Sequence, residues 1–187
     1  FVCVIGARFD GHSVAEDVLK QGASAVIVTR DLGLKEQIIV ENSREAYALM
    51  CKNLFGRSAD KLKIIGITGT NGKTSVSGII HNILIGLGEK SALSGTIGFN
   101  LNGVLYESAN TTSDSLNTQQ MIFRAKSEGC RAMVMEVSSH GLALGRLAGV
   151  DYDVAVFTNL THDHLDFHGT MEEYLKVEKN YIDFILK

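Results

Sequence analysis

The most constraining feature of the sequence is a short apolar run that leads through a glycine-rich turn into a helical segment. The run is KIIGI at residues 63–67, the turn is GTNGKTS at 69–75, and helical periodicity extends over about 73–87. Two further apolar runs, at 131–137 and 153–158, have the length and composition of buried strands and alternate with helical segments. This alternation predicts an α/β fold with a mostly parallel sheet and flanking helices.

The segments between these runs fit the same architecture. Residues 91–106 contain strand-like runs around the Asn-Gly pair at 102–103, which is typical of a two-residue β-hairpin turn. A helix is expected to begin after Ser113 or Asp114, either of which can cap it, and to end at Gly129.

Residues 1–60 predict a separate, smaller α/β unit. It contains the strand-like runs FVCVI, AVIVT and IIV and helical segments at 13–21 and 43–55. The charged stretch DKLK at 60–63 marks the expected boundary, so we predict a partial N-terminal domain over 1–60 and a partial central domain over 61–187. Because the sequence starts within a strand-like run and stops within a helix-like one, we expect it to be a piece of a longer protein.

The composition argues against several classes of protein. Of the 187 residues, 45% are hydrophobic and 21% charged, as in ordinary globular proteins. The net charge of -3 gives no reason to expect nucleic-acid or membrane binding, and no apolar run approaches the roughly 20 residues of a membrane span. Cys3, Cys51 and Cys130 are too few and too widely spaced for a disulfide framework or a cysteine-based zinc site. We therefore expect a cytoplasmic protein, and a monomer.

The glycine-rich turn predicts a site for the phosphates of ATP. Small residues let backbone N–H groups approach phosphate oxygens, and a helix N-terminus favours negative charge. Lys73 can reach the β- and γ-phosphates, and the hydroxyl of Thr74 can hold Mg²⁺. The match to the Walker A motif is incomplete, because Ile67 stands at the position of its first glycine. The residues of the turn expected to bind ATP are Gly69, Thr70, Asn71, Gly72, Lys73, Thr74 and Ser75.

A second polar cluster follows the predicted strand at 131–137. Glu136 is the lone charge near the end of this apolar strand, and a buried carboxylate needs a cation or hydrogen bonds. Mg²⁺ beside a phosphate site would supply the cation, although a Glu at a strand end can equally emerge into solvent. Ser138, Ser139 and His140 are interpreted as substrate hydrogen-bonding groups rather than a nucleophilic pair. Arg146 is either an anion clamp or a solvated surface residue.

The segment THDHLDFHGT, residues 161–170, places three histidines around two aspartates. Read as H-x-H-x-D, it is similar to the ligand run of zinc hydrolases of the metallo-β-lactamase type. That run needs adjacent Asp and His, whereas Phe167 separates Asp166 from His168, and such a hydrolase offers no role for GTNGKT. Since ligands of parallel sheets gather at the carboxyl ends of the strands, this segment is expected to lie beside the other two clusters.

Together these motifs make the sequence resemble the Mur ligase family. GTNGKT is shared by Mur ligases and folylpolyglutamate synthetases. ANTTSDS, MEVSSHGL and TNLTHDHLDFHGTMEEY resemble the ligases that add a diamino acid to a UDP-N-acetylmuramoyl-dipeptide. FDGHSVAEDVLKQGASAVIV is similar to the end of their N-terminal, UDP-binding domain. The resemblance covers nearly the whole chain and implies a P-loop-like central ATPase domain, without the C-terminal domain that binds the amino acid.

The resemblance implies an ATP-dependent amide ligation in peptidoglycan synthesis. The carboxylate of UDP-N-acetylmuramoyl-L-Ala-D-Glu would take the γ-phosphoryl group of ATP, and an amino group of the diamino acid would then displace phosphate. Thr74, Glu136 and His164 would hold Mg²⁺, with Lys73 on the ATP phosphates. Asn159 would line the nucleotide site. The positions that match holders of the UDP-sugar-peptide are Thr111, Thr112, Ser138 and Arg146.

Two positions depart from the family pattern. Ser113 stands where the family usually has Pro, and it can still cap the following helix. A carbamylated Lys usually lies four residues after the Tyr of MEEY, and here that position is Glu178. Helical phase puts Lys176 and Lys179 on the polar face of this helix. The face that carries Glu178 is otherwise apolar and consists of Tyr174, Leu175, Tyr181, Ile182 and Ile185.

We therefore hypothesise that Glu178 replaces the carbamate and acts in catalysis with Lys73 and His164. A shifted helical register that turns Lys179 inward is the alternative. Among other functions, a cyanophycin-synthetase or folylpolyglutamate type of ligase and, further off, a zinc hydrolase remain open, although DGH…GA and EVSSHGL argue against the other ligases. The sequence leaves open whether the added residue is meso-diaminopimelate or L-lysine.

Overall fold

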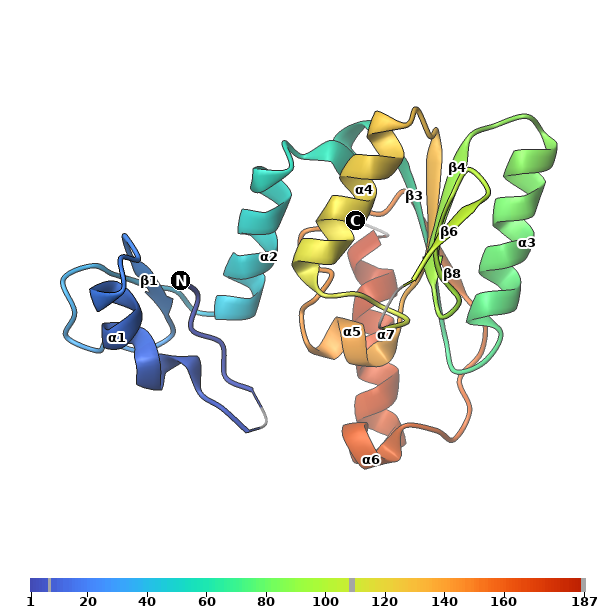
Figure 1. Cartoon of the computed structure of the whole chain (residues 1–187). Coiled ribbons are helices and arrows are strands. Elements are labelled where there is room, and N and C mark those ends of the chain that lie inside the picture. Colours follow the sequence, from blue (N-terminus) through green and yellow to red (C-terminus); the bar gives the residue numbers. More distant parts are fainter. Residues whose placement is uncertain (7, 108–109, 186–187) are drawn as a thin grey trace.

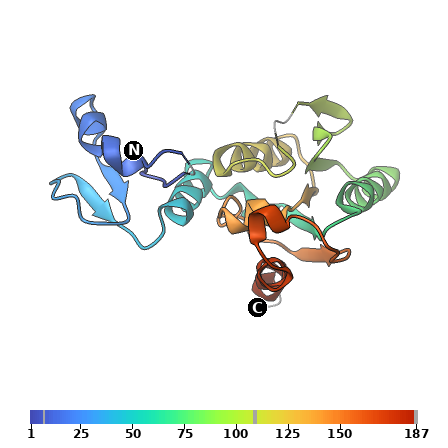
Figure 2. The ribbon, with the colours of Figure 1, turned by 90° about the horizontal axis from the view of Figure 1, so that it is seen from below.

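The computed structural model describes residues 1–6, 8–107 and 110–185 of the chain. A small N-terminal lobe with a two-stranded sheet stands apart from a larger α/β unit with a six-stranded sheet, and helix α2 (Ser43–Leu54) lies between them (Figures 1 and 2). In the described residues, no helix combines the length and the apolar character needed to cross a membrane.

The larger unit is built on a sheet with the strand order β6-β5-β4-β7-β3-β8. The four strands β4, β7, β3 and β8 are parallel to their neighbours, and β5 and β6 continue from β4 as an antiparallel meander. The prediction of a mostly parallel sheet with flanking helices is therefore confirmed. The strands are β3 (Lys63–Thr68), β4 (Ser91–Gly95), β5 (Gly98–Leu101), β6 (Val104–Tyr106), β7 (Ala132–Glu136) and β8 (Val154–Phe157).

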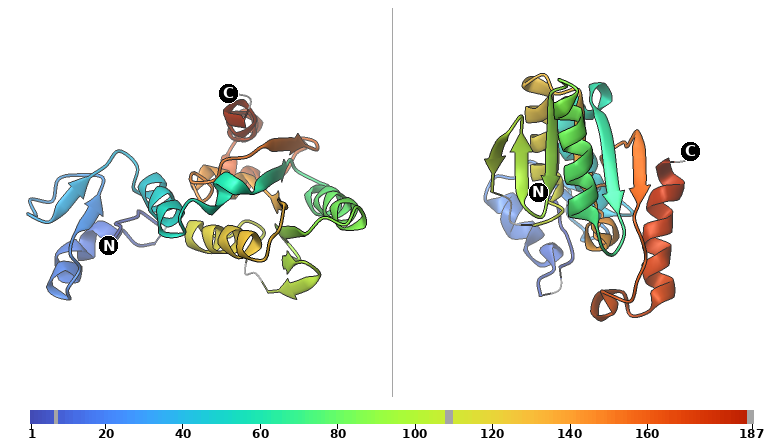
Figure 3. Two further views of the ribbon diagram at one scale, coloured as in Figure 1. Left: turned by 90° about the horizontal axis from the view of Figure 1, so that it is seen from above. Right: turned by 90° about the vertical axis from the view of Figure 1, so that its right-hand side faces the viewer.

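Helices cover both faces of this sheet. Helix α3 (Lys73–Gly86) packs on one face, and α4 (Ser115–Ser127) and α7 (Met171–Ile185) lie on the other, with α7 along the edge strand β8 (Figures 1 and 3). The short helices α5 (Ser139–Ala143) and α6 (Leu165–His168) follow β7 and β8 at the carboxyl ends of the strands. The largest core cluster lies beneath α4 and α7 and includes Ile64, Ile122, Met133, Met135 and Tyr181.

Local sequence signals account for several element ends. Gly88, at φ 81°, donates to Ile85 while Glu89 donates to Leu84, and this pair of bonds closes the end of α3. The Asn-Gly pair at 102–103 has positive φ at both residues and joins β5 to β6, as the hairpin prediction required. Asp114 caps α4 by accepting from the backbone N–H of Asn117.

The N-terminal lobe differs from the sequence prediction at its first strand. FVCVI forms only isolated bridges, from Val2 to Ile27 and from Ile5 to Asp10, because the chain turns back after Ile5 and divides its pairing between two partners. The other predicted strands and helices are present. They are the 3-10 helix η1 (Gly11–Val14) with α1 (Ala15–Lys20), β1 (Val26–Val28), β2 (Gln37–Ile39) and α2 (Ser43–Leu54). The 3-10 helix η2 (Ser58–Lys61), next to the predicted boundary, was not expected from the sequence.

Gly66 of β3 leaves room for the side chains of Tyr181 and Tyr152 against the sheet. A Cβ atom at Gly66 would lie 1.8 Å from the hydroxyl oxygen of Tyr181 and 2.7 Å from Cε1 of Tyr152. Gly66→Ala is therefore expected to destabilise the protein by about 1–3 kcal/mol, as overpacking of a core does. The check is denaturant unfolding beside Gly78→Ala, whose Cβ meets nothing within 4 Å on α3. The control is expected to be neutral or to stabilise by roughly 0.5–1 kcal/mol, and equal stabilities would contradict this packing.

Candidate nucleotide-binding site

A cleft of about 570 Å³ lies at the carboxyl ends of the parallel strands. The loops that follow β3, β4, β7 and β8 all contribute to it, so the three polar clusters of the sequence do meet. Its wall combines hydroxyl, amide, cationic and anionic groups, which suits a polar, charged ligand. The residues that line it are Thr70, Asn71, Gly72, Lys73, Thr74, Thr96, Asn110, Thr111, Thr112, Glu136, Ser138, His140, Leu144, Arg146, Asp163 and His164.

The glycine-rich loop between β3 and α3 forms one side of the cleft. Gly69 and Gly72 have φ of 119° and 86°, conformations that residues with side chains rarely adopt. Gly69 must also lack a side chain, because a Cβ there would lie 2.3 Å from Oγ1 of Thr158. Gly72 is the N-cap of α3, so the first N–H groups of that helix lack intrahelical partners at the cleft. The Nζ of Lys73 donates to the carbonyl oxygens of Gly69, at 2.6 Å, and Thr70, at 2.9 Å.

The loop is held in place by residues that follow β8. The backbone N–H of Thr70 donates to the carbonyl oxygen of Asn159, and the N–H of Asn71 donates to its Oδ1 at 3.1 Å. The Nδ2 of Asn159 returns a bond to the carbonyl of Asn71 at 3.0 Å. Asn159 therefore supports the loop from behind and is not among the residues that line the cleft.

Glu136 lies at the end of β7 and is only 3% exposed. Its Oε2 accepts from the hydroxyls of Thr74 at 2.9 Å and Thr96 at 3.0 Å, and its Oε1 accepts from the N–H of Thr96 at 3.0 Å. Gly95 makes room for the carboxylate, since a Cβ there would lie 2.0 Å from Oε1. All of these donors are neutral, and in the described part of the chain no ion pair to Glu136 is found. A cation in the cleft would complete the compensation of this buried charge.

The predicted substrate-binding residues lie together on the other side of the cleft. The hydroxyl of Thr112 donates to the carbonyl of Glu136 at 3.1 Å and accepts from the N–H of Ser138 at 2.9 Å. Arg146 donates from Nη1 to the carbonyl of Thr112 at 2.9 Å and still lines the cleft. The hydroxyl of Thr111 lies 3.0 Å from that of Thr96. The arrangement orients Arg146 toward the cleft, where its remaining N–H groups can bind an anion.

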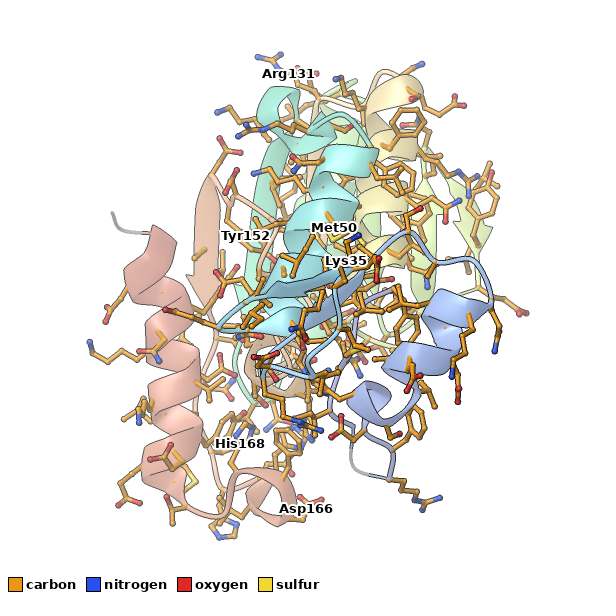
Figure 4. All side chains as sticks on the ribbon, turned by 90° about the vertical axis from the view of Figure 1, so that its left-hand side faces the viewer. Lys35, Met50, Arg131, Tyr152, Asp166 and His168 are labelled. Atoms are coloured by element: carbon orange, nitrogen blue, oxygen red, sulfur yellow. The ribbon has the colours of Figure 1, made fainter. Side chains whose placement is uncertain are left out.

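Two of the three histidines of segment 161–170 belong to an aromatic cluster. The ring of His164 lies 5.1 Å from that of His140, and His168 is stacked on Tyr174 at 4.9 Å. Figure 4 shows His168 beside α7 and Asp166 on the outer side of α6. Burial, with the charge of neighbouring histidines, lowers the pKa values of His140 and His168. In the described residues, no three His, Cys, Asp or Glu side chains are grouped as a metal site would require.

Glu178 lies behind the glycine-rich loop, on the buried face of α7. It is 1% exposed, and its Oε2 accepts from the hydroxyl of Thr68 at 2.5 Å. Its Oε1 is buried without a hydrogen-bond partner in the described structure. Burial raises the pKa of Glu178, although the hydrogen bond from Thr68 and the charge of Lys73 oppose this shift. Glu178 does not line the cleft, so direct contact with a ligand there would require its side chain to leave Thr68.

The exposure of the two lysines on α7 excludes the alternative register, in which Lys179 would turn inward. Lys179 is exposed and pairs with Asp183, and Lys176 is exposed and pairs with Glu173. The prediction of the buried face is confirmed for Tyr174, Glu178 and Tyr181 and is wrong for Leu175, which is 47% exposed. The side chain of Ile185 lies outside the described part of the structure.

A second cleft, of about 520 Å³, contains none of the predicted site residues. It lies between α2, the segment after α5, and α7, and its walls are mainly apolar, with Leu142, Leu147, Val150, Tyr152 and Val177 among them. The polar cleft is therefore the candidate site.

Comparison with known proteins agrees with this location of the site. The model of the Mur ligase middle domain matches residues 67–185, which contain the glycine-rich loop, Glu136 and α7. The chain belongs to the Mur ligase family. It spans 36% of the length of the curated relatives that it matches, so it corresponds to about a third of those Mur ligases.

The similar Mur ligases include enzymes named for two different amino acids. The chain is 46% identical over 175 residues to the UDP-N-acetylmuramoyl-L-alanyl-D-glutamate–2,6-diaminopimelate ligase of Geobacillus kaustophilus, with 93% of the chain covered. It is 45% identical over 177 residues to the corresponding L-lysine ligase of Staphylococcus haemolyticus, again with 93% covered. Identity over this part of the protein therefore does not separate the two specificities.

Solved structures of Mur ligases share the fold. A 2,6-diaminopimelate ligase superposes with a TM-score of 0.82 at 34% identity, over 93% of this chain and 36% of the other. The MurF ligase of Thermotoga maritima in complex with ADP gives a TM-score of 0.59 at 25% identity, over 97% and 39%.

Three residues of this Mur ligase site were not expected from the sequence. Thr96 binds Glu136 through both its N–H and its hydroxyl, Thr161 binds Thr70, and Tyr174 contacts the loop from α7. Only Tyr174 had a sequence signal, namely its place on the predicted buried face. Thr96 and Thr161 are hydroxyl residues in the segments that follow β4 and β8, and their partners are distant in sequence.

Proposed function

We propose that the protein is an ATP-dependent ligase that joins a diamino acid to UDP-N-acetylmuramoyl-L-Ala-D-Glu in the cytoplasm, as a monomer. The observation that carries the proposal is the single cleft that combines the glycine-rich loop, the buried carboxylate of Glu136 and the guanidinium group of Arg146. The relatives named as ligases of this dipeptide support the choice of substrate. We also propose that residues 1–60 and 61–187 are parts of its UDP-substrate-binding and central domains.

In the proposed site, the loop and Lys73 bind the phosphates of ATP. Gly72, Lys73 and Thr74 at the start of α3 line the cleft, and the Nζ of Lys73 can exchange the loop carbonyls for phosphate oxygens. Ser75 lies in the first turn of α3. Asn159 acts indirectly, by fixing the backbone of Thr70 and Asn71.

The residues present fit a Mg²⁺ ion. The hydroxyl of Thr74 can donate to Glu136 and present a lone pair to the metal, and Glu136 brings a negative charge with neutral donors only. His164 lines the same cleft and is the third proposed ligand. Bound there, Mg²⁺ would neutralise the charge that develops on the transferring phosphoryl group.

The UDP-linked dipeptide would be held at Thr111, Thr112, Ser138 and Arg146. An oxygen of its carboxylate attacks the γ-phosphorus of ATP, the bond to ADP breaks, and an acyl phosphate forms. The amino group of the diamino acid then attacks the acyl carbon, and phosphate leaves with the bonding electron pair. The chain's own contribution is positioning and charge neutralisation, and Glu178 is proposed as an additional catalytic carboxylate in place of the family's carbamylated Lys.

The proposal is tested by phosphate release from the intact protein with MgATP, the UDP-linked dipeptide and each diamino acid in turn. Release is expected with one of meso-diaminopimelate and L-lysine, and only when the dipeptide is present. Lys73→Ala is expected to reduce the rate by roughly 10²–10³-fold, as loss of one positioned charge-stabilising group does. Lys176→Ala, on the exposed face of α7, is the matched control and keeps the rate. No release with either amino acid would reject the function.

A further inference from the structure

Helix α7 contacts the glycine-rich loop on both sides of Gly69. The hydroxyl of Tyr174 lies 3.0 Å from the hydroxyl of Thr70, and one helical turn later Glu178 binds the hydroxyl of Thr68. Tyr174 and Glu178 are each 1% exposed, so both contacts are shielded from water. Hydrogen bonds in such an environment are strong, and a partner left without its bond is costly.

The Thr70 hydroxyl is the junction of three segments. It accepts from the backbone N–H of Thr161 at 2.9 Å, and it lies 3.0 Å from the hydroxyl oxygen of Tyr174 and 3.4 Å from the carbonyl oxygen of Thr161. Since the N–H of Thr70 is bound to the carbonyl of Asn159, both the backbone and the side chain of this residue are fixed. Thr70 lines the cleft two residues before the N-cap of α3, so its position determines where the loop backbone lies.

Tyr174 is itself fixed by the segment that carries His164. Its ring is stacked on His168, with an interplanar angle of 11°, and the Nε2 of His168 lies 2.9 Å from the hydroxyl oxygen of Ser139. The ring of His164 lies 6.0 Å away at an interplanar angle of 72°. Tyr174 therefore connects α5 and segment 161–170 to the loop.

We infer that Tyr174 is a positioning residue for the glycine-rich loop, acting through the hydrogen bond between its hydroxyl and Thr70. The bond fixes the backbone that binds the nucleotide phosphates, while the tyrosine ring only fills space between α7 and His168. The consequence for ATP rests on the proposed function, whereas the effect on the loop does not.

The structure provides a matched control on the same helix. Tyr181 is also buried, at 5% exposure, but in the described structure its hydroxyl has no hydrogen-bond partner. Tyr174→Phe and Tyr181→Phe thus make the same chemical change in similar surroundings, and only the first removes a bond to the loop. A tyrosine that merely fills the core would give the same result at both positions.

The test measures hydrogen–deuterium exchange of loop residues 69–72 and the affinity of the intact protein for MgATP. Tyr174→Phe is expected to speed exchange in the loop and to weaken MgATP binding by about three- to tenfold, which corresponds to one lost hydrogen bond. Tyr181→Phe is expected to leave both unchanged. If Tyr174→Phe does not fold, Thr70→Val removes the same bond from the other side, together with the contacts of this hydroxyl with Thr161, and Thr70→Ser is the variant expected to restore wild-type behaviour.

Equal loop exchange in the two Phe variants would overturn the inference. So would additive effects on loop exchange in the Tyr174→Phe, Thr70→Val double variant, because two changes that break one bond must act non-additively. Faster loop exchange in Tyr174→Phe, together with a wild-type protein that does not bind MgATP, would support the positioning role and reject the proposed function instead.

Discussion

Glu136→Gln is expected to reduce ATP-dependent activity by about 10²–10³-fold while the protein stays folded. The change keeps the volume of the side chain but removes its charge. Both carboxylate oxygens accept hydrogen bonds, from Thr74 and Thr96. The change also replaces one of these oxygens by an NH₂ group, which cannot accept them. The proposed cation would lose its anionic ligand. The measurement is the initial rate of phosphate release against Mg²⁺ concentration, together with the melting temperature.

Gly95→Ala is also expected to reduce activity, because it displaces the carboxylate of Glu136 instead of removing its charge. The new Cβ would lie 2.0 Å from Oε1 of Glu136, so the carboxylate must move away from Thr74. Glu107→Gln, at an exposed position, and Gly78→Ala, where a Cβ meets nothing, are the matched controls. Full activity of Glu136→Gln at ordinary Mg²⁺ would show that this carboxylate serves the fold and not the reaction.

The central part of the fold could be predicted because its signals are local. The strand, glycine-rich turn and helix around GTNGKTS are contiguous, and the hairpin depends on two adjacent residues that favour positive φ. The parallel topology then brings the loop, Glu136 and segment 161–170 to one edge of the sheet without further information. FVCVI was predicted as a strand and is not one, because strand formation there depends on partners elsewhere in the chain.

The finer geometry of the site depends on contacts between distant segments. The interaction of Thr96 with Glu136 spans 40 residues and requires the register of β4 against β7. Helical phase predicted that Glu178 is buried but not that it binds Thr68, since that contact spans 110 residues. Leu175 fits an apolar stripe in sequence and is nevertheless exposed, because periodicity does not fix how far a packing surface extends around a helix.

Glu178→Gln is expected to stabilise the protein and to lower its activity. The hydroxyl of Thr68 has one hydrogen but lies 2.5 Å from Oε2 of Glu178 and 2.9 Å from the carbonyl of Val137. The single hydrogen of Thr68 can serve only one of these two acceptors while Glu178 is ionised, whereas a protonated carboxyl can donate to Thr68 and leave that hydrogen for Val137. A Gln amide can donate in the same way without a buried charge. The variant therefore removes an unfavourable ionisation but also removes the carboxylate proposed for catalysis.

The stabilisation by Glu178→Gln is expected to depend on pH. Burial raises the pKa of Glu178 above its ordinary value of 4.5, so the folded state binds the proton more tightly than the unfolded state. Stability from this group is fully present below pH 4.5 and is lost as the pH rises through the raised pKa. The melting temperature of Glu178→Gln should thus exceed that of the wild type more at pH 8 than at pH 5. In a chain of this size, roughly 2–4 °C corresponds to 1 kcal/mol.

Differential scanning calorimetry across this pH range tests the expected gain in stability, and phosphate release at neutral pH tests the expected loss of activity. Glu172→Gln, on the exposed side of α7, is the control and should show neither the pH-dependent stabilisation nor the loss of activity. A Glu178→Gln variant that is more stable and fully active would mean that the carboxyl has no part in catalysis. A variant that is less stable at pH 8 would mean that Glu178 is ionised and held by its neighbours. Higher stability together with lower activity of Glu178→Gln would show that the buried carboxyl lowers the stability of the fold and serves the reaction, as functional residues often do.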